Sequence, residues 1–181
     1  DIYSVGDCAS VHNRITGQPM WSPMGSTANL TGRILAQNIS GQREEKIKYH
    51  GALGTAIAKL PNLNIGRTGL TEAQAREAGF DVESVVLTID DKAHYYPGAS
   101  NLMLKLIADR TSGKFLGLQA LGGGSVDKVV DIAVSCLSLG AKLEDLVDLD
   151  LAYAPPFSTA ISPFVHGVNV LLNKIDDRLT S

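Results

Sequence analysis

Three short segments of the sequence carry residue types that could take part in chemistry, and the first is a glycine followed by an aspartate. Gly6 and Asp7 end the opening run DIYSVGD, whose apolar residues are typical of a buried strand. A carboxylate in that place can accept hydrogen bonds from the hydroxyl groups of a sugar or polyol, and the glycine lets a ligand approach the backbone closely. An aspartate that only caps a turn gives the same pattern, so this pair alone leaves two interpretations open.

The second segment is a serine and a proline that begin a helix. Ser22 predicts an N-cap, and Pro23 suits the first helical position because its missing N–H is not needed there. We expect the residues that follow, Gly25, Ser26 and Thr27, to form the first turn. The positive end of the helix dipole favours negative charge on a neighbouring group. The order strand, Gly-Asp, loop and helix therefore fits a site where a ring system gains negative charge on reduction.

The third segment holds a tyrosine beside two prolines, YAPPFSTA at residues 153–160. Two prolines stiffen an extended segment, so we expect Tyr153 to be held firmly. Its phenol, with an ordinary pKa of about 10, can donate a hydrogen bond or a proton to a thiolate or peroxide leaving group. Tyr95 and Tyr96 form a second cluster in HYYPG. Packing of the rings against proline is the alternative interpretation of both clusters.

Cysteines and histidines offer little further chemistry. Cys8 and Cys136 stand far apart without CxxC spacing, which favours free thiols over a disulfide or a zinc site. The four histidines show no i, i+4 pairs and have no acidic partner at ligand spacing. We therefore expect no metal site.

Composition narrows the class of protein. The 181 residues are 44% hydrophobic and 19% charged, with a formal net charge of −3, which excludes a disordered chain and makes a nucleic-acid partner unexpected. No apolar run reaches the roughly 20 residues that a membrane-spanning helix needs, and no charged segment leads into an apolar run at the start of the given sequence. We expect a cytoplasmic protein with one or two compact units and no membrane partner.

The elements that must position these residues fall into two parts. Residues 2–7 predict a strand, residues 8–21 a loop, and the helix from Pro23 should end at Gly41. The polar run at residues 42–48 marks the boundary between a first part, 1–45, and a second part, 46–181. Because a domain seldom begins inside a strand, we expect the chain to be the C-terminal piece of a longer protein.

The second part reads as short strands followed by helices. Strands are expected at residues 55–60, 62–67, 82–89, 102–108 and 114–120, with a hairpin turn at 109–113. Helices are expected after the capping box at 71–74, at 126–139, at 142–149 and from Pro163. Helices segregated beside an antiparallel sheet of four or five strands define an α+β fold. The last helix should bury its apolar face against a second copy of the chain; that face holds Phe164, Val165, Val168, Leu171 and Leu172.

These segments together resemble the C-terminal part of the flavin-dependent pyridine nucleotide-disulfide oxidoreductases, in the branch of the coenzyme A-disulfide reductases and NADH oxidases. DIYSVGDCA at residues 1–9 is similar to the second FAD motif of that family. TGQPMWSPMGSTANLTGRILAQNISG at 16–41 is similar to the segment whose helix start lies under the flavin. VDKVVDIAVSCLSLGAKLEDLVDLDLAYAPPFS at 126–158 resembles the dimerisation domain, preceded by a strand-loop-helix remnant of the FAD domain.

The resemblance implies a role for each candidate residue. It implies that Gly6 and Asp7 contact the FAD ribityl chain, and that Pro23 and the first turn at 25–27 lie by the isoalloxazine. It also implies a homodimer in which the C-terminal domain of one subunit completes the active site of the other. Glutathione-reductase-like members carry a His-Pro-Thr motif there. This chain has YAPPFS instead, so Tyr153 and one of Tyr95 or Tyr96 are expected to hydrogen-bond the disulfide or thiolate.

The implied activity is NAD(P)H-dependent reduction of a low-molecular-weight acceptor through FAD. After YAPPFS, residues 161–167 depart from the pattern AKDPVNMAG of coenzyme A-disulfide reductases. The acceptor therefore stays open between a coenzyme A disulfide-like molecule, a persulfide or polysulfide, and oxygen. The nucleotide motif, the NAD domain and the redox cysteine of the family would precede residue 1, so the isolated chain is expected to be inactive. The alternative is a non-catalytic dimerisation or interaction module that retains the fold.

Overall fold

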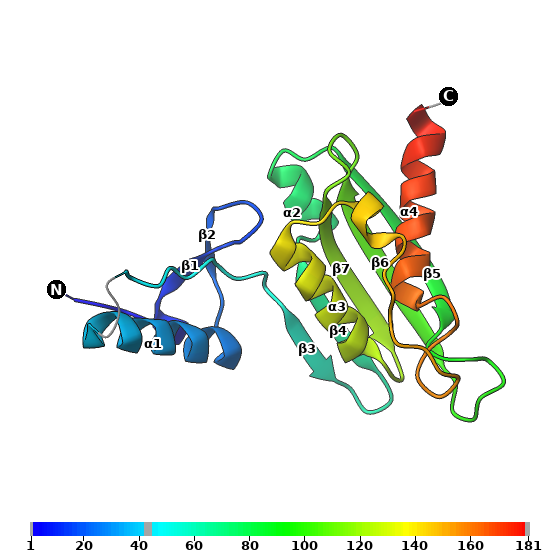
Figure 1. Ribbon diagram of the computed structural model, residues 1–181, viewed down its shortest axis with the longest axis horizontal. Helices are drawn as coiled ribbons and strands as arrows, with labels where there is room; N and C mark the ends of the chain where they lie inside the picture. Colours follow the sequence, from blue (N-terminus) through cyan, green and yellow to red (C-terminus); the bar gives the residue numbers. More distant parts are fainter. Residues whose placement is uncertain (1, 42–44, 180–181) are drawn as a thin grey trace. The chain divides into compact units, whose positions relative to one another are not determined.

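A computed structural model describes residues 2–41 and 45–179, which form two compact units, Asp1–Gly54 and Thr55–Ser181. Figure 1 draws both units. Residues 42–44 of the polar run that marked the expected boundary lie outside the described residues.

The first unit is a small hairpin beside a helix. β1 (Ser10–His12) pairs antiparallel with β2 (Pro19–Trp21), inside the segment expected to be a loop. The expected strand at residues 2–7 is wrong: Gly6–Cys8 forms a 3₁₀ helix and the residues before it are irregular. Within the described residues no strand pairs with this segment, so its backbone has no ladder of hydrogen bonds to join.

The contacts within the chain place the boundary between the two units later than the expected residue 45, because residues 45–54 pack on the first unit. The side chain of Asn38 accepts a hydrogen bond from the Ile47 N–H at 2.8 Å and donates one to the Ile47 carbonyl at 2.9 Å. Ala52 exchanges backbone hydrogen bonds with His12 and Arg14. Residues 45–54 are therefore part of the first unit.

The second unit is built on a five-stranded antiparallel sheet in the order β3-β4-β7-β6-β5, which confirms the predicted α+β class. The strands are β3 (Ala56–Lys59), β4 (Asn64–Gly69), β5 (Val82–Asp90), β6 (Asn101–Asp109) and β7 (Phe115–Gly122). β5, β6 and β7 are consecutive antiparallel neighbours, and the turn between β6 and β7 has Gly113 at φ 68°, as the sequence predicted. The pairing of β4 with β7 joins this meander to the β3–β4 hairpin.

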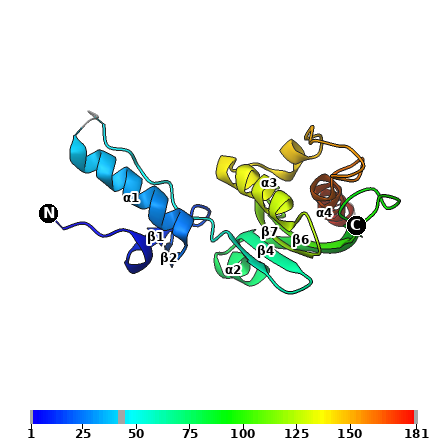
Figure 2. The same ribbon diagram turned by 90° about the horizontal axis from the view of Figure 1, so that it is seen from below.

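Helices cover the two faces of the sheet unequally. Figure 2 shows α3 (Val126–Leu139) and α4 (Pro163–Leu179) on one face and α2 (Glu72–Glu77) on the other. The side chains of Val126 and Val130 in α3 lie so close to Gly66 of β4 that a Cβ there would meet them at 3.0 and 2.8 Å. Small residues in the sheet thus let the helix approach the backbone.

Local signals predicted the ends of most helices. Thr71 caps α2 with a full capping box to Gln74, Gly140 ends α3 with a left-handed φ of 69°, and α4 begins at Pro163. Two expectations were wrong. The helix expected at 142–149 is a 3₁₀ turn at Leu143–Leu146. α1 (Gly25–Ser40) has Met24 as its N-cap, not Ser22, because the Met24 N–H is drawn back to the Ser22 carbonyl at 2.8 Å.

The core lies between the sheet and α3 and α4. Phe115 of β7 and Phe164 of α4 are both 0% exposed, and their rings meet edge to face with centroids 5.7 Å apart. The expectation that a second copy of the chain buries the apolar face of α4 is wrong. Val168 and Leu171 are fully buried within this unit, Val165 is buried, and only Leu172 is half-buried, because α4 packs against β5 and β6.

Exposed apolar side chains gather instead on the opposite face of the sheet. Ile65, Val86 and Met103 are 47%, 61% and 44% exposed. They border an open hollow of about 500 Å³ together with the charged side chains of Arg67 and Lys105.

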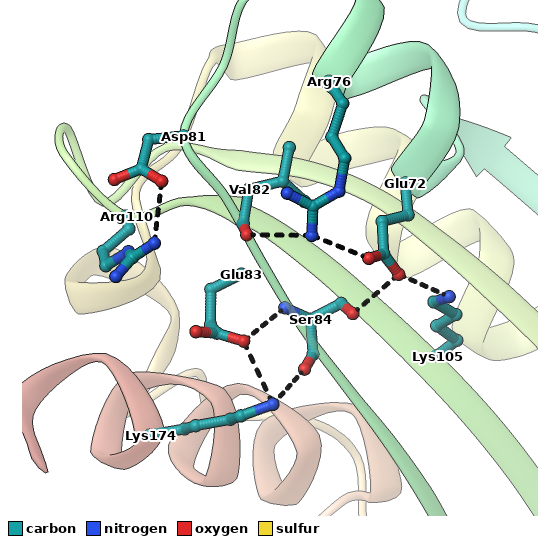
Figure 3. Close-up of polar contacts among 9 residues, drawn as sticks. All are labelled: Glu72, Arg76, Asp81, Val82, Glu83, Ser84, Lys105, Arg110 and Lys174. Atoms are coloured by element: carbon teal, nitrogen blue, oxygen red, sulfur yellow. Dashed lines mark hydrogen bonds and ion pairs between the residues drawn. The ribbon is translucent and has the colours of Figure 1, made fainter. Parts of the chain in front are cut away.

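A polar network ties α2 and α4 to β5 and β6, as Figure 3 shows. Glu72 of α2 accepts from Lys105 at 2.7 Å, from Arg76 at 2.8 Å and from the hydroxyl of Ser84 at 3.0 Å. These donors, led by Lys105, lower the pKa of Glu72 from 4.5 to about 2. Lys174 of α4 reaches the same strand and donates to the Ser84 carbonyl at 2.8 Å.

We expect Glu72→Gln to destabilise the protein in a pH-dependent way. Because the folded pKa of Glu72 lies below its unfolded value, its contribution is complete above pH 4.5 and is lost as the pH falls toward 2. The side chain is 31% exposed, so solvent screening limits the loss to about 1 kcal/mol. Urea unfolding between pH 3 and 7 measures it, with Glu77→Gln, an exposed residue of the same helix, as the control. A difference between the two variants that does not shrink toward low pH would contradict the assignment.

Candidate functional site

The Gly-Asp pair lies on a tight turn that is packed against α1. Gly6 has a φ of 78°, a conformation that favours glycine, and a Cβ at this position would stand 3.6 Å from the Cβ of Ala28. The carboxylate of Asp7 is exposed. Trp21 fixes the turn from the other side, because its indole N–H donates to the Asp7 carbonyl at 2.8 Å. The turn thus presents an acidic side chain from a rigid backbone.

The N-terminus of α1 is open to a ligand. No side chain caps it at Met24, and Gly25 and Ser26 are exposed. Thr27 is buried, and its hydroxyl lies 3.0 Å from that of Ser22, so this side chain serves the packing of the first turn. No acidic residue occupies the first turn of the helix, so nothing there offsets the positive end of its dipole. An exposed carboxylate and an uncapped helix start in one unit fit a cofactor with polyol hydroxyls and an electron-accepting ring.

Tyr153 is less enclosed than the sequence indicated. It is 51% exposed, and its phenol makes no hydrogen bond within the part of the chain that the structure describes. The two prolines after it do not extend the chain: they form a turn closed by the Phe157 N–H, which donates to the Ala154 carbonyl at 2.8 Å. The turn leaves Tyr153 at its start with a free hydroxyl, able to donate to a bound group.

Tyr95 and Tyr96 lie on the loop between β5 and β6. Tyr95 is 76% exposed and Tyr96 is 37% exposed. The Tyr96 N–H donates to the Ala93 carbonyl and the Ala99 N–H to the Tyr96 carbonyl, at 2.8 and 3.1 Å, so this backbone is folded into consecutive turns. In Figures 1 and 2 this loop and the segment after residue 150 lie near the same end of the sheet.

Sequence reasoning missed two polar residues that support these loops. Lys128 of α3 donates from its ammonium group to the Phe157 carbonyl at 3.3 Å, in the turn that follows Tyr153. Asp91 is 3% exposed and accepts a hydrogen bond from the Ser100 N–H at 2.9 Å, across the base of the Tyr95–Tyr96 loop. Neither residue stands in a recognisable motif. The one signal that the sequence offered was the position of Asp91 just after an expected strand.

The described residues contain neither a metal-binding cluster nor a membrane-spanning helix. Over the described residues, no group of three or more His, Cys, Asp or Glu side chains is arranged to hold a metal ion. The helices within residues 2–41 and 45–179 include none with the length and apolar character that a membrane crossing requires. Cys136 is buried in the core, where desolvation raises its thiol pKa.

The fold and the candidate residues agree with one class of protein, the flavin-linked oxidoreductases that dimerise through an α+β domain. The sequence profile described as "Pyridine nucleotide-disulphide oxidoreductase, dimerisation domain" matches residues 55–163, more than half of the chain. The chain therefore belongs to the pyridine nucleotide-disulphide oxidoreductase family.

Several of the proteins similar to this chain have names that refer to sulfur compounds or disulfides. An NAD(P)H sulfur oxidoreductase (CoA-dependent) of Pyrococcus furiosus is 36% identical over 94% of this chain and 38% of the relative. A coenzyme A disulfide reductase of Staphylococcus aureus is 30% identical over 87% of this chain and 35% of the relative. The solved NAD-dependent persulfide reductase of A. fulgidus superimposes with a TM-score of 0.92 at 37% identity, over 97% of this chain and 32% of that one. The chain thus spans less than two fifths of the length of each of these proteins.

Proposed function

We propose that this chain is the C-terminal part of an FAD-dependent NAD(P)H oxidoreductase that reduces a low-molecular-weight disulfide, persulfide or polysulfide. The observation that carries the proposal is the match of the family profile to residues 55–163, next to a unit with an uncapped helix start and an exposed aspartate. FAD, when bound, would carry electrons from the nicotinamide to the sulfur acceptor. Oxygen is the second candidate acceptor, favoured by an NADH oxidase of Methanocaldococcus jannaschii that is 31% identical over 98% of this chain.

In this proposal the first unit binds the flavin. The exposed carboxylate of Asp7 accepts hydrogen bonds from the ribityl hydroxyls, beside Gly6. Pro23, just before α1, and the first turn of the helix, Gly25, Ser26 and Thr27, lie near the ring. The backbone N–H groups of that turn and the positive helix end favour the negatively charged reduced state of the ring. We place the functional boundary between flavin-binding and dimerisation parts near residue 45.

The second unit forms the homodimer and supplies tyrosines to the active site of the partner subunit. Tyr153 donates a hydrogen bond from its phenolic hydroxyl to the sulfur atom that leaves as a thiolate. Tyr96 is the favoured second donor, because it is held by two backbone hydrogen bonds and abuts Pro97, whereas Tyr95 is the more exposed of the pair. The side chain of Tyr153 is half-exposed and its hydroxyl has no partner within the described residues, which suits a site that a second subunit completes.

The full-length protein that contains this chain should purify with bound FAD, and Asp7→Asn should weaken FAD binding about tenfold. The asparagine keeps one acceptor oxygen but loses the charge, and hydrogen bonds to charged groups are worth about 1 kcal/mol more than neutral ones. Flavin absorbance and FAD titration of the apoprotein measure the effect. Asp127→Asn, an exposed aspartate of the second unit, serves as the control. A full-length protein that shows no flavin spectrum after FAD addition would leave the non-catalytic dimerisation module as the better interpretation.

A further inference from the structure

The loop that carries Tyr95 and Tyr96 is closed at its base by one buried carboxylate. Asp91 is 3% exposed and lies directly after β5. Its Oδ1 accepts from the Ser100 N–H at 2.9 Å and its Oδ2 from the Ser100 hydroxyl at 3.2 Å, while its own N–H donates to the Ser100 carbonyl at 2.9 Å. Three hydrogen bonds between these two residues hold the ends of the loop together.

The same carboxylate lies against the segment that leads into α3. A Cβ on Gly124 would stand 2.8 Å from Oδ2 of Asp91 and would meet no other atom within 4 Å. One on Gly123 would stand 3.2 Å from the Ser100 hydroxyl. Ser125 then takes a left-handed conformation, φ 47°, before the helix begins. The backbone at residues 123–125 is therefore shaped around the Asp91–Ser100 pair.

α3 connects this pair to the other tyrosine segment. Its first turn carries Lys128, whose ammonium group donates to the Phe157 carbonyl in the turn after Tyr153. A negative charge at the start of α3 also lies at the favourable end of the helix dipole. Both tyrosine segments thus contact one short stretch of structure, residues 123–128, the first through Asp91 and Ser100 and the second through Lys128.

We propose that Asp91 is a positioning residue for the reaction with the sulfur acceptor: it sets the place of the Tyr95–Tyr96 loop relative to the start of α3, and thereby relative to Tyr153. This role rests on the proposed function. Because Asp91 is buried, the proposal assigns it no contact with substrate or flavin. It acts by holding the two ends of the loop together, in addition to the turns of the loop and to the contact of His94 Nδ1 with Asp90 Oδ2 at 3.0 Å. A displacement of about 1 Å in such a loop is enough to lower a rate by up to about 100-fold.

The first test compares Asp91→Ala with a matched variant in the full-length protein. Asp109→Ala is that variant, because Asp109 is also buried, closes a loop through the N–H and hydroxyl of a serine, Ser112, and lies at the other end of β6, away from the tyrosines. Asp91→Ala should slow electron transfer to a disulfide acceptor by about 10- to 100-fold and leave flavin reduction by NAD(P)H unchanged. Asp109→Ala should change neither rate. Equal slowing by both variants would reduce Asp91 to a structural role and overturn the proposal.

Two further variants separate position from charge and from simple loss of stability. Asp91→Asn keeps an acceptor for the Ser100 N–H, so it should restore most of the rate lost in Asp91→Ala. Gly124→Ala should lower the acceptor rate in the otherwise unchanged protein, because its methyl group meets only the Asp91 carboxylate, and should have no further effect in the Asp91→Ala background. Additive effects of the two changes would contradict the proposed contact.

Amide hydrogen exchange distinguishes failure of this inference from failure of the proposed function. It needs no activity. Asp91→Ala should speed exchange at the Tyr96 and Ala99 amides at least tenfold, and Asp109→Ala should not. Faster exchange in a protein without reductase activity would support the role of Asp91 in holding the loop and would refute the proposed function. Unchanged exchange would overturn the role of Asp91 in holding the loop. Faster exchange with an unchanged acceptor rate would overturn the part of Asp91 in the reaction.

Discussion

Tyr153→Phe in the full-length protein should slow reduction of the disulfide acceptor by about 10²- to 10³-fold, the usual effect of removing one hydrogen-bond donor from a transition state that water cannot reach. The phenol has no partner within the described residues, so the substitution removes a donor without leaving a buried group unpaired. The ring and the turn behind it stay in place. Flavin reduction by NAD(P)H should be unaffected, because the lost hydroxyl serves only the sulfur acceptor.

Stopped-flow absorbance of the flavin separates the two half-reactions. Tyr49→Phe removes a hydroxyl from a tyrosine outside the proposed site and should leave both rates unchanged. Stability should change by less than about 1.5 kcal/mol, since one hydroxyl is lost from a half-exposed side chain. Normal acceptor reduction in Tyr153→Phe would leave Tyr153 as a residue that packs beside prolines, with no part in the chemistry.

Phe164→Ala should destabilise the protein by about 3 to 5 kcal/mol, the largest loss we expect from a single core substitution. Phe164 is 0% exposed at the start of α4, and its ring meets that of Phe115 edge to face, so truncation removes an aromatic pair and leaves a cavity beneath the helix. Denaturant unfolding of the full-length protein measures the loss. Leu139→Ala, a residue 87% exposed at the end of α3, should cost less than about 0.5 kcal/mol. Similar losses in the two variants would mean that the core lies elsewhere.

Local signals predicted much of this fold. The capping box at Thr71, the left-handed glycines at 113 and 140, and the proline that begins α4 are each decided by residues within a few positions, so the sequence alone is enough. The order of the strands was not predictable in the same way, since the pairing of β4 with β7 joins residues far apart in the chain. The apolar face of α4 was recognised correctly, but amphipathicity does not tell which surface covers it.

The candidate site divides along the same line. Asp7, the start of α1 and Tyr153 were found because they stand in short patterns, and their roles in chemistry stay predictions. Asp91 and Lys128 were missed, because each matters only through a partner, Ser100 or Phe157, that the fold brings near. The prediction of an opening strand at residues 2–7 was wrong for a related reason. A strand needs neighbouring strands to pair with, and the described residues supply none to this segment.

The pairing of β4 with β7 also has a consequence for the kinetics of folding. The β3–β4 hairpin and the β5–β6–β7 meander are each made of strands that are adjacent in sequence. Each can therefore form at a small cost in loop-closure entropy. Their union, in which Gly69 pairs with Gly117 and the Leu70 N–H donates to the Leu116 carbonyl at 2.9 Å, must bring distant parts of the chain together. A Cβ on Gly117 would stand 2.1 Å from the Leu70 carbonyl oxygen, so β4 and β7 can pair here only because Gly117 has no side chain. The contacts at this glycine-lined junction join residues much farther apart in sequence than the contacts within either half, so we expect the folding barrier of the domain to be concentrated there.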